Sequence, residues 1–198
     1  MQLVLASSSP YRKQLLERLQ IPFECQAPGI DENALSGEAP SATVLRLARE
    51  KAQALHKHFP EHLIIGSDQL ACHGGRMIGK PGKHERALSQ LLSFSGQTVE
   101  FLTSVCVYNS KTQTSTEALV STEVSFRTLD KALIENYLRA ERPYDCAGSF
   151  KAEGLGIALF EKVSSDDPTA LMGLPLIQLC EQLAEQNFSV LSRKTQPN

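Results

Sequence analysis

The chain has 198 residues, of which 41% are hydrophobic, and its formal net charge at pH 7 is −2. This composition predicts one globular domain over residues 1–198, or two small lobes, with a substantial core. A weakly acidic chain lacks the broad positive surface that binds a nucleic-acid polymer, so we expect phosphate recognition to be local. The start Met-Gln-Leu-Val-Leu does not read as a signal peptide, and no apolar stretch reaches membrane-spanning length. The scattered cysteines contain no Cys-x-x-Cys pair and indicate free thiols. We therefore expect a cytoplasmic protein with no membrane contact.

The first predicted elements are a strand over residues 3–6 and a helix over residues 10–19, joined by three serines. Ser9 is a favourable N-cap for this helix, because its side chain can accept a backbone N–H group. The hydroxyl groups of Ser7 and Ser9, the helix N-terminus and the cation Arg12 therefore meet at one point. That combination suits an anion such as phosphate.

A predicted helix over residues 41–58 carries Lys51 on its apolar face. Lys51 follows Leu47 by four residues and Val44 by seven, which is the spacing of one helical face. A buried ammonium group is costly without a partner. Lys51 therefore either extends along the edge of this face with its charge in water or points into a cleft filled by phosphate. Its position alone leaves both interpretations open.

Residues 63–65 form a fully apolar run that is typical of a central strand, and residues 66–69 are predicted as the turn that follows it. Asp68 lies in this turn. Carboxylates at the ends of sheet strands often lie in the crevice where ligands bind, so Asp68 is a candidate functional residue. The alternative is a carboxylate that only caps a turn, and the sequence does not decide between the two.

Further charged residues occur in predicted loops. The carboxylate pairs at residues 31–32 and 166–167 are each typical of a solvated turn, but several carboxylates together can share a divalent cation that also binds phosphate. Lys80 places a cation in the tight turn at residues 79–81. Residues 148–156 are rich in glycine and either wrap a ligand closely or precede a strand. No Walker-type glycine loop and no Gly-x-Gly-x-x-Gly occurs, which argues against a kinase or a Rossmann protein.

The remaining predicted elements alternate between strands and helices. The strands cover residues 21–26, 98–108, 117–126 and 157–163, and the helices cover residues 84–93, 129–139 and 175–186. This alternation predicts an α/β fold, and the long hairpin over residues 98–126 predicts that its sheet is mixed.

Taken together, these motifs resemble the Maf family of nucleoside triphosphate pyrophosphatases. The matching pieces are Leu-Ala-Ser-Ser-Ser-Pro-Tyr-Arg-Lys-x-Leu-Leu at residues 5–16, Asp31-Glu32, Glu50-Lys51-Ala52, Gly66-Ser67-Asp68-Gln69, Gly79-Lys80-Pro81, Ala147-Gly148-Ser149-Phe150, Glu153-Gly154 and Gly173-Leu174-Pro175. They occur in family order over nearly the whole chain, and the ordered set is specific although no single piece is. The resemblance implies an elongated mixed β-sheet with flanking helices, in two lobes around a cleft, related to the inosine triphosphatase architecture.

The resemblance also implies an activity and a set of residue roles. A divalent cation, Mg²⁺ or Mn²⁺, would assist hydrolysis of a nucleoside triphosphate to the monophosphate and pyrophosphate, and a homodimer is expected because family members often form one. Asp68 matches the catalytic aspartate that accepts a proton from the attacking water. The residues on substrate-binding positions are Ser9, Arg12, Lys51 and Lys80, with Ser7 in the same serine loop. Glu32 matches an acidic position that helps to hold the metal together with Asp68.

Three further positions sort substrates within the family, and here they are Tyr11, Gln69 and Glu153. An aromatic residue, Gln and Glu resemble the branch that acts on 7-methyl-GTP, although that branch usually carries Trp where this chain has Tyr11. Two alternatives remain open. One is a pyrimidine triphosphate pyrophosphatase of the same family, and the other is a nucleotide-binding regulator that acts through a partner, for example in cell division.

Overall fold

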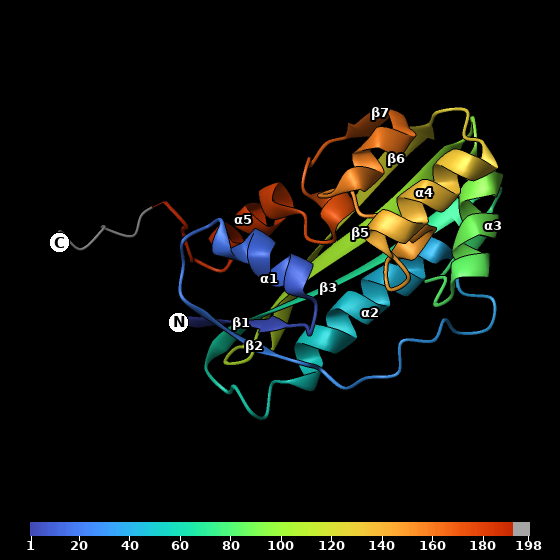
Figure 1. The fold of residues 1–198 in the computed structure, drawn as a ribbon. Helices are drawn as coiled ribbons and strands as arrows, with labels where there is room; N and C mark the ends of the chain where they lie inside the picture. Colours follow the sequence, from blue (N-terminus) through green and yellow to red (C-terminus); the bar gives the residue numbers. More distant parts are fainter. Residues whose placement is uncertain (192–198) are drawn as a thin grey trace.

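The computed structural model describes residues 1–191 and forms a seven-stranded mixed β-sheet with flanking helices (Figure 1). The strands follow the order β2-β1-β3-β5-β6-β7, with β4 paired to β3. They are β1 (Gln2–Ala6), β2 (Phe23–Gln26), β3 (His62–His73), β4 (Arg76–Ile78), β5 (Thr98–Asn109), β6 (Thr114–Phe126) and β7 (Phe160–Ser165). The helices are α1 (Pro10–Glu17), α2 (Pro40–Ala54), α3 (His84–Phe94), α4 (Lys131–Glu141) and α5 (Leu176–Glu185), with short 3₁₀ turns η1 (Ala147–Ser149), η2 (Leu155–Leu159) and η3 (Ala170–Met172). The predicted α/β class with a mixed sheet is confirmed, and residues 192–198 of the predicted domain lie outside the described residues.

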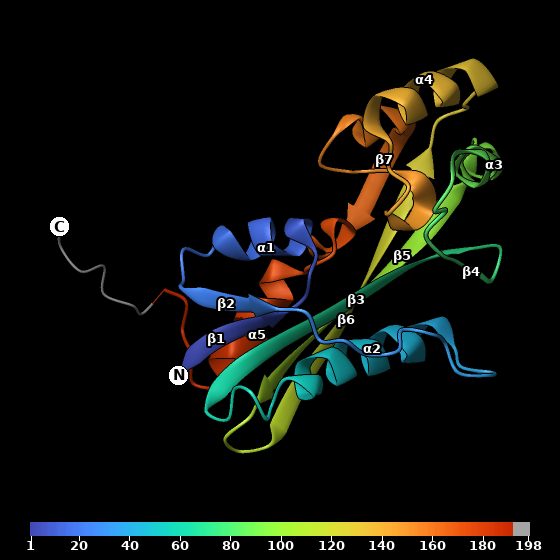
Figure 2. The same ribbon diagram turned by 60° about the horizontal axis from the view of Figure 1, so that its bottom comes forward.

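Helices cover both faces of the first half of the sheet (Figure 2). β1 pairs in parallel with β2 and β3, and successive side chains along these strands point to opposite faces. Leu5 and Ile65 pack with apolar side chains of α1 and α5, whereas Val4 and Ile64 pack under α2. Burial on both faces explains why residues 63–65 are uniformly apolar.

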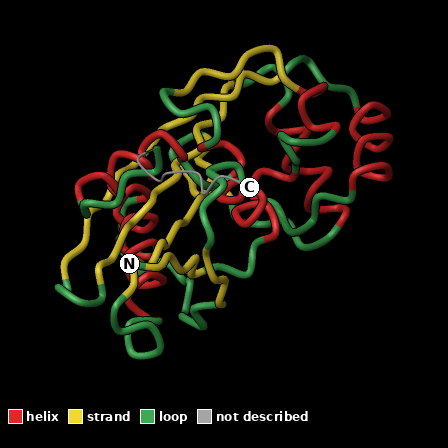
Figure 3. The backbone as a smooth tube through the Cα atoms, turned by 90° about the vertical axis from the view of Figure 1, so that its left-hand side faces the viewer, coloured by secondary structure: helices red, strands yellow, loops and turns green. Residues whose placement is uncertain are grey.

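The second half of the sheet has a core of its own, built around five phenylalanines. The antiparallel strands β3, β5 and β6 extend into this half, where α3 and α4 lie (Figures 1 and 3). Ring centroids within the cluster are 4.8 to 5.7 Å apart, in tilted or edge-to-face pairs. The members are Phe94, Phe101, Phe126, Phe150 and Phe160. One set of long strands therefore connects two separately packed lobes.

The turn predicted at residues 66–69 is wrong, because β3 continues through this segment to His73. β5 pairs with β3 along the whole segment, and Asp68 lies opposite Ser104. A Cβ atom on Gly66 would fall 2.0 Å from the carbonyl oxygen of Ala48 in α2. Gly66 is therefore needed for the close approach of a helix to the strand and does not mark a turn.

The other predicted elements agree with the structure more closely. Gly74 and Gly75 form the turn between β3 and β4, and both have positive φ angles. The strand predicted over residues 157–163 begins only at Phe160, because the chain first makes the η2 turn. The five helices lie where they were predicted, with ends that differ by about one turn or less.

Candidate active site

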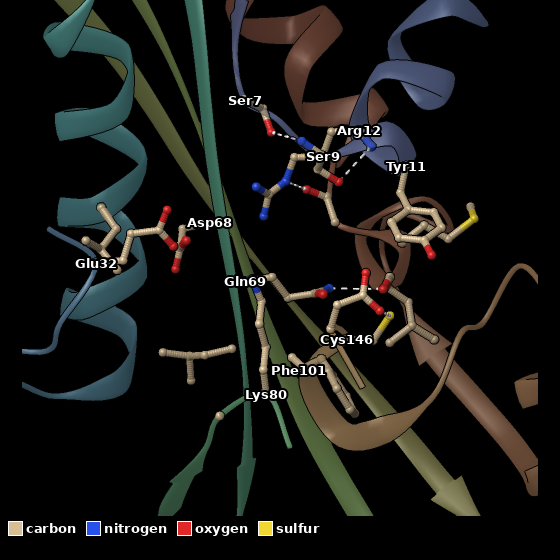
Figure 4. A pocket seen from close by; sticks show the side chains of 18 of the residues that line it. Ser7, Ser9, Tyr11, Arg12, Glu32, Asp68, Gln69, Lys80, Phe101 and Cys146 are labelled. Carbon is tan, nitrogen blue, oxygen red and sulfur yellow. Dashed lines mark hydrogen bonds between the residues drawn. The ribbon is translucent and has the colours of Figure 1, made fainter. Parts of the chain in front are cut away.

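A cleft of about 570 Å³ opens where one edge of β3 has no neighbouring strand among the described residues (Figure 4). On this edge, β1 pairs with β3 as far as Ile65, and β4 begins to pair at Ala71. Residues 66–70 pair only with β5 on the other edge. Because side chains alternate along a strand, groups from both faces of the sheet reach this gap. The volume is typical of a site for a small molecule.

Asp68 points to the α2 face of β3 and forms an ion pair with Lys51. Lys51 Nζ donates a hydrogen bond to Asp68 Oδ1 at 2.7 Å and lies 3.2 Å from Glu32 Oε1. Only 3% of Lys51 and 7% of Asp68 is exposed. Lys51 therefore lies inside the cleft between two carboxylates, which are the partners that a buried ammonium group requires. Its charge therefore does not extend into water along the edge of the helix face, and phosphate binding by Lys51 stays a prediction.

The serine loop after β1 forms the predicted cap of α1. Ser9 Oγ accepts the backbone N–H of Arg12 at 3.4 Å, and Ser7 Oγ accepts that of Ser9 at 3.1 Å. Each hydroxyl is an acceptor in these bonds, so its own proton can be donated to an anion. Both serines line the cleft together with the positive end of the α1 dipole, so these groups meet at one point as expected. Phosphate binding at this point stays a prediction.

Arg12 is oriented by a backbone carbonyl that sequence reasoning missed. Its Nε donates to the Gly173 oxygen at 2.8 Å, and Ser67 Oγ lies 2.8 Å from the same oxygen. Gly173 has φ +102°, in the region that favours glycine, and the only signal for it in the sequence was its place in a family motif. Burial lowers the pKa of Arg12, while the charges of Asp68 and Glu32 act in the opposite direction. A guanidinium remains charged in proteins, and Figure 4 shows its terminal nitrogens turned toward the gap beside β3.

Gln69 points to the face of β3 opposite Asp68 and anchors the η3 turn. Its Nε2 lies 2.9 Å from Thr103 Oγ1, 2.9 Å from the Ala170 carbonyl and 3.0 Å from that of Leu171. These contacts engage the donor side of the amide, which leaves Oε1 as the group that a ligand can use. Its role in specificity stays a prediction.

Tyr11 and Glu153 line the other end of the cleft and also an adjoining pocket of about 180 Å³. Burial raises the pKa of Tyr11, and a hydrogen bond with Lys151 only partly opposes this effect. The phenol is therefore neutral at physiological pH. Lys80 is an exposed cation in the loop after β4, and it lines the cleft below Gln69 in Figure 4.

Cys146 also lines the cleft, although no sequence signal pointed to it. Burial raises the pKa of its thiol to about 12, and the nearby carboxylate of Asp145 adds to the effect. Only a thiolate is an effective nucleophile, so Cys146 is a neutral part of the wall at physiological pH.

Asp167 is a structural cap, which corrects the hypothesis that the pair at residues 166–167 shares a divalent cation. Its buried carboxylate accepts N–H groups of Thr169 at 3.0 Å and of Ile177 in α5 at 2.7 Å. Within residues 1–191, no group of three or more His, Cys, Asp or Glu side chains could hold a metal ion. Glu32 and Asp68 are the carboxylates that meet at Lys51. Two carboxylates fit a cation such as Mg²⁺ that takes its other ligands from substrate phosphates and water, and they do not fit a metal held by protein alone.

The fold and the cleft define a two-lobed α/β protein whose cleft contains a buried carboxylate–ammonium pair beside a helix N-terminus. The family model for Maf-like protein matches residues 2–186, so the chain belongs to the Maf family. Among the described residues, no helix is long and apolar enough to cross a membrane.

Similar proteins cover nearly the whole chain. A protein of Pseudomonas syringae pv. tomato described as 7-methyl-GTP pyrophosphatase is 54% identical, over 95% of this chain and 98% of its own. A protein of Pseudomonas fluorescens with the same description is 55% identical, over 91% and 94%. Among solved structures, a HAM1 protein from Coxiella burnetii aligns over 93% of this chain and 99% of its own, with a TM-score of 0.49 and 14% identity.

Proposed function

We propose that this chain hydrolyses 7-methyl-GTP to 7-methyl-GMP and pyrophosphate, in a housecleaning role against modified nucleotides. The observation that carries the proposal is the buried Lys51–Asp68 pair in the gap beside β3, next to the N-terminus of α1 and the oriented guanidinium of Arg12. The descriptions of the 54% and 55% identical relatives support the choice of substrate.

Three cations suit the triphosphate. All three side chains line the cleft: Lys51 extends from α2, Arg12 from the opposite side of β3, and Lys80 from the loop after β4. When water attacks the α-phosphorus, the bond to the bridging oxygen breaks and negative charge develops on the departing pyrophosphate. Cations that are already in place stabilise this charge without reorganisation during the reaction.

Asp68 is the proposed base. Its Oδ1 accepts the hydrogen bond from Lys51, and its second oxygen can accept a proton from the attacking water. A protein that only binds a nucleotide needs no positioned base, so this arrangement favours an enzyme over the regulator considered from the sequence.

The same carboxylate is proposed to hold a divalent cation together with Glu32. Mg²⁺ or Mn²⁺ bound there would neutralise phosphate charge during the reaction. The predicted homodimer and cytoplasmic location stay predictions.

Tyr11 and Glu153 suit a methylated guanine. Methylation at N7 makes the ring cationic, and a flat cation is attracted to an aromatic face. A carboxylate can accept hydrogen bonds from N1–H and the 2-amino group of guanine. Uracil and thymine offer one N–H and no amino group, so they would leave Glu153 poorly paired. This contrast favours 7-methyl-GTP over the pyrimidine alternative.

The proposal is tested by identifying the products formed from 7-methyl-GTP, GTP, UTP and dTTP, with Mg²⁺, with Mn²⁺ and with EDTA. We expect 7-methyl-GMP and pyrophosphate, the highest kcat/KM for 7-methyl-GTP, and no turnover with EDTA. Preferential turnover of UTP and dTTP would agree with the proposed reaction but refute 7-methyl-GTP as the preferred substrate. Binding of these nucleotides without turnover would favour the regulator.

A further inference from the structure

The loop that carries Glu153 is held on both sides of this residue by Glu141, the last residue of α4. Glu141 Oε2 accepts the backbone N–H of Leu155 at 2.8 Å. Lys151 Nζ donates to the Glu141 carbonyl oxygen at 3.2 Å and lies 3.8 Å from its Oε1. Glu153 therefore lies midway between two residues that Glu141 holds.

Close packing leaves this loop little freedom at its present position. A Cβ atom on Gly154 would fall 2.7 Å from Glu141 Oε2, and one on Gly156 would fall 2.3 Å from the Lys151 carbonyl oxygen. The side chains of Glu141 and Lys151 are each only 19% exposed, so water screens their interaction weakly. The contacts with Glu141, together with a hydrogen bond from the backbone N–H of Lys151 to Tyr137 Oη at 3.0 Å, hold the loop that carries Glu153.

Lys151 also connects this loop to the aromatic residue on α1. Burial lowers the pKa of Lys151, but a hydrogen bond with Tyr11 acts in the opposite direction, and the pKa is raised overall. An unpaired ammonium group at this point would repel a cationic base. The carboxylate of Glu141 offsets the positive charge of Lys151 and leaves the hydrogen bond between Lys151 and Tyr11 in place.

We propose that Glu141 is a positioning residue for base recognition, which holds the loop of Glu153 and offsets the charge of Lys151 beside Tyr11. The inference rests on the proposed function, since it requires Glu153 and Tyr11 to contact the base. Glu141 is not among the residues that line the cleft, so it acts through its neighbours. Its loss therefore weakens binding of one class of base more than it slows the chemical step.

The test compares steady-state kinetics of Glu141→Ala and the wild type with 7-methyl-GTP and with UTP. We expect KM for 7-methyl-GTP to rise about tenfold, while kcat and the parameters for UTP change by less than about twofold. Glu141→Gln keeps an acceptor for the Leu155 N–H and should recover part of the loss. In the Glu153→Gln background, Glu141→Ala should lower the selectivity less than it does in the wild type, because only its effect on the charge of Lys151 remains.

Glu135→Gln is the matched control. Glu135 also lies on α4 and pairs with His84 and Arg139, but it does not contact the loop of Glu153. An unchanged KM for 7-methyl-GTP in Glu141→Ala would overturn the inference, and so would an additive loss in the double variant or an equal loss with UTP. The proposed function is tested separately by the wild type: if it shows no preference for 7-methyl-GTP, that function fails before any variant is compared.

Discussion

The proposed phosphate end of the cleft, around Asp68 and Lys51, and its proposed base end, around Glu153, are built from different parts of the fold. Asp68 and Lys51 lie on a strand and a helix, and both are buried. Glu153 is exposed and lies in irregular chain between η1 and η2. Regular elements hold side chains more rigidly than loops do, whereas loops vary without loss of the fold. The proposed general base and its lysine partner therefore depend on the framework of the sheet, while Glu153, the carboxylate proposed to read guanine, depends on a loop attached to it.

The largest effect is expected at the phosphate end, from Asp68→Asn. The amide can still accept the hydrogen bond from Lys51, but it cannot take a proton from water. We expect kcat to fall about 10²- to 10⁴-fold, for 7-methyl-GTP and UTP alike. Pyrophosphate release measures the effect, and a cooperative unfolding transition well above the assay temperature serves as the control for folding, since Lys51 keeps Glu32 as a charged partner. A folded variant that keeps wild-type kcat would exclude Asp68 as the base.

Gly66→Ala tests whether the arrangement of Asp68 and Lys51 depends on the close packing of α2 against β3. The added Cβ would collide with the Ala48 carbonyl and push α2, with Lys51, away from β3. We expect the free energy of unfolding in urea to fall by about 3 kcal/mol or more. Gly79→Ala is the control, because a Cβ there meets nothing within 4 Å, and it should change stability by less than about 0.5 kcal/mol. Equal stability of the two variants would show that the close approach is dispensable.

At the base end, Glu153→Gln should lower the selectivity for 7-methyl-GTP over UTP and leave the stability of the fold unchanged. We expect the ratio of kcat/KM for 7-methyl-GTP over UTP to fall about tenfold, because one hydrogen bond to the cationic guanine is lost together with the charge. Glu161→Gln, at an exposed position on β7, is the control for removal of a carboxylate. If the ratio is the same in wild type and Glu153→Gln, Glu153 does not read the base.

Tyr11→Trp should give a smaller effect in the opposite direction. Trp has the aromatic face that attracts cations most strongly, so KM for 7-methyl-GTP should fall about threefold, whereas Tyr11→Leu should raise it. Kinetics with UTP provide the control, since a neutral base gains no cation–π attraction. A rise in KM for Tyr11→Trp would indicate that the contact between Tyr11 and Lys151 outweighs stacking.

The smallest effect is expected on stability in acid. The loop that carries Glu32 is held against α2 by an ion pair between Glu38 and Arg46. Arg46 donates hydrogen bonds to Glu38 at 2.7 and 2.8 Å, and also to the Asn33 carbonyl. The hydrogen bond from Arg46 lowers the pKa of Glu38 from 4.5 to about 2. A lowered pKa in the folded state stabilises the fold fully above pH 4.5, and this stabilisation is lost as the pH falls toward 2.

The melting temperature of the wild type should therefore exceed that of Glu38→Gln at pH 6, and the gap should narrow between pH 4.5 and 2. Glu24→Gln, at an exposed position on β2, controls for the general effect of acid. A gap that does not depend on pH would contradict the lowered pKa.

The sequence by itself determined the α/β class, the positions of the helices, the cap formed by Ser9 and the apolar face that carries Lys51. Each of these depends on residues within one or two helical turns, so local spacing and side-chain chemistry are sufficient. The ordered motifs added the family, because several short segments in a fixed order are far more specific than any one of them.

Only the tertiary structure decided how these residues meet. Gly66 has the local signature of a turn, yet it packs against Ala48 in α2, and pairing with β5 keeps β3 extended through Asp68. The carbonyl of Gly173 orients Arg12 across 161 positions of the chain, and Glu141 holds the loop of Glu153 from another element. A backbone carbonyl carries no residue-specific signal, and a glutamate on a helix does not indicate which distant segment it contacts, so packing alone reveals these partners.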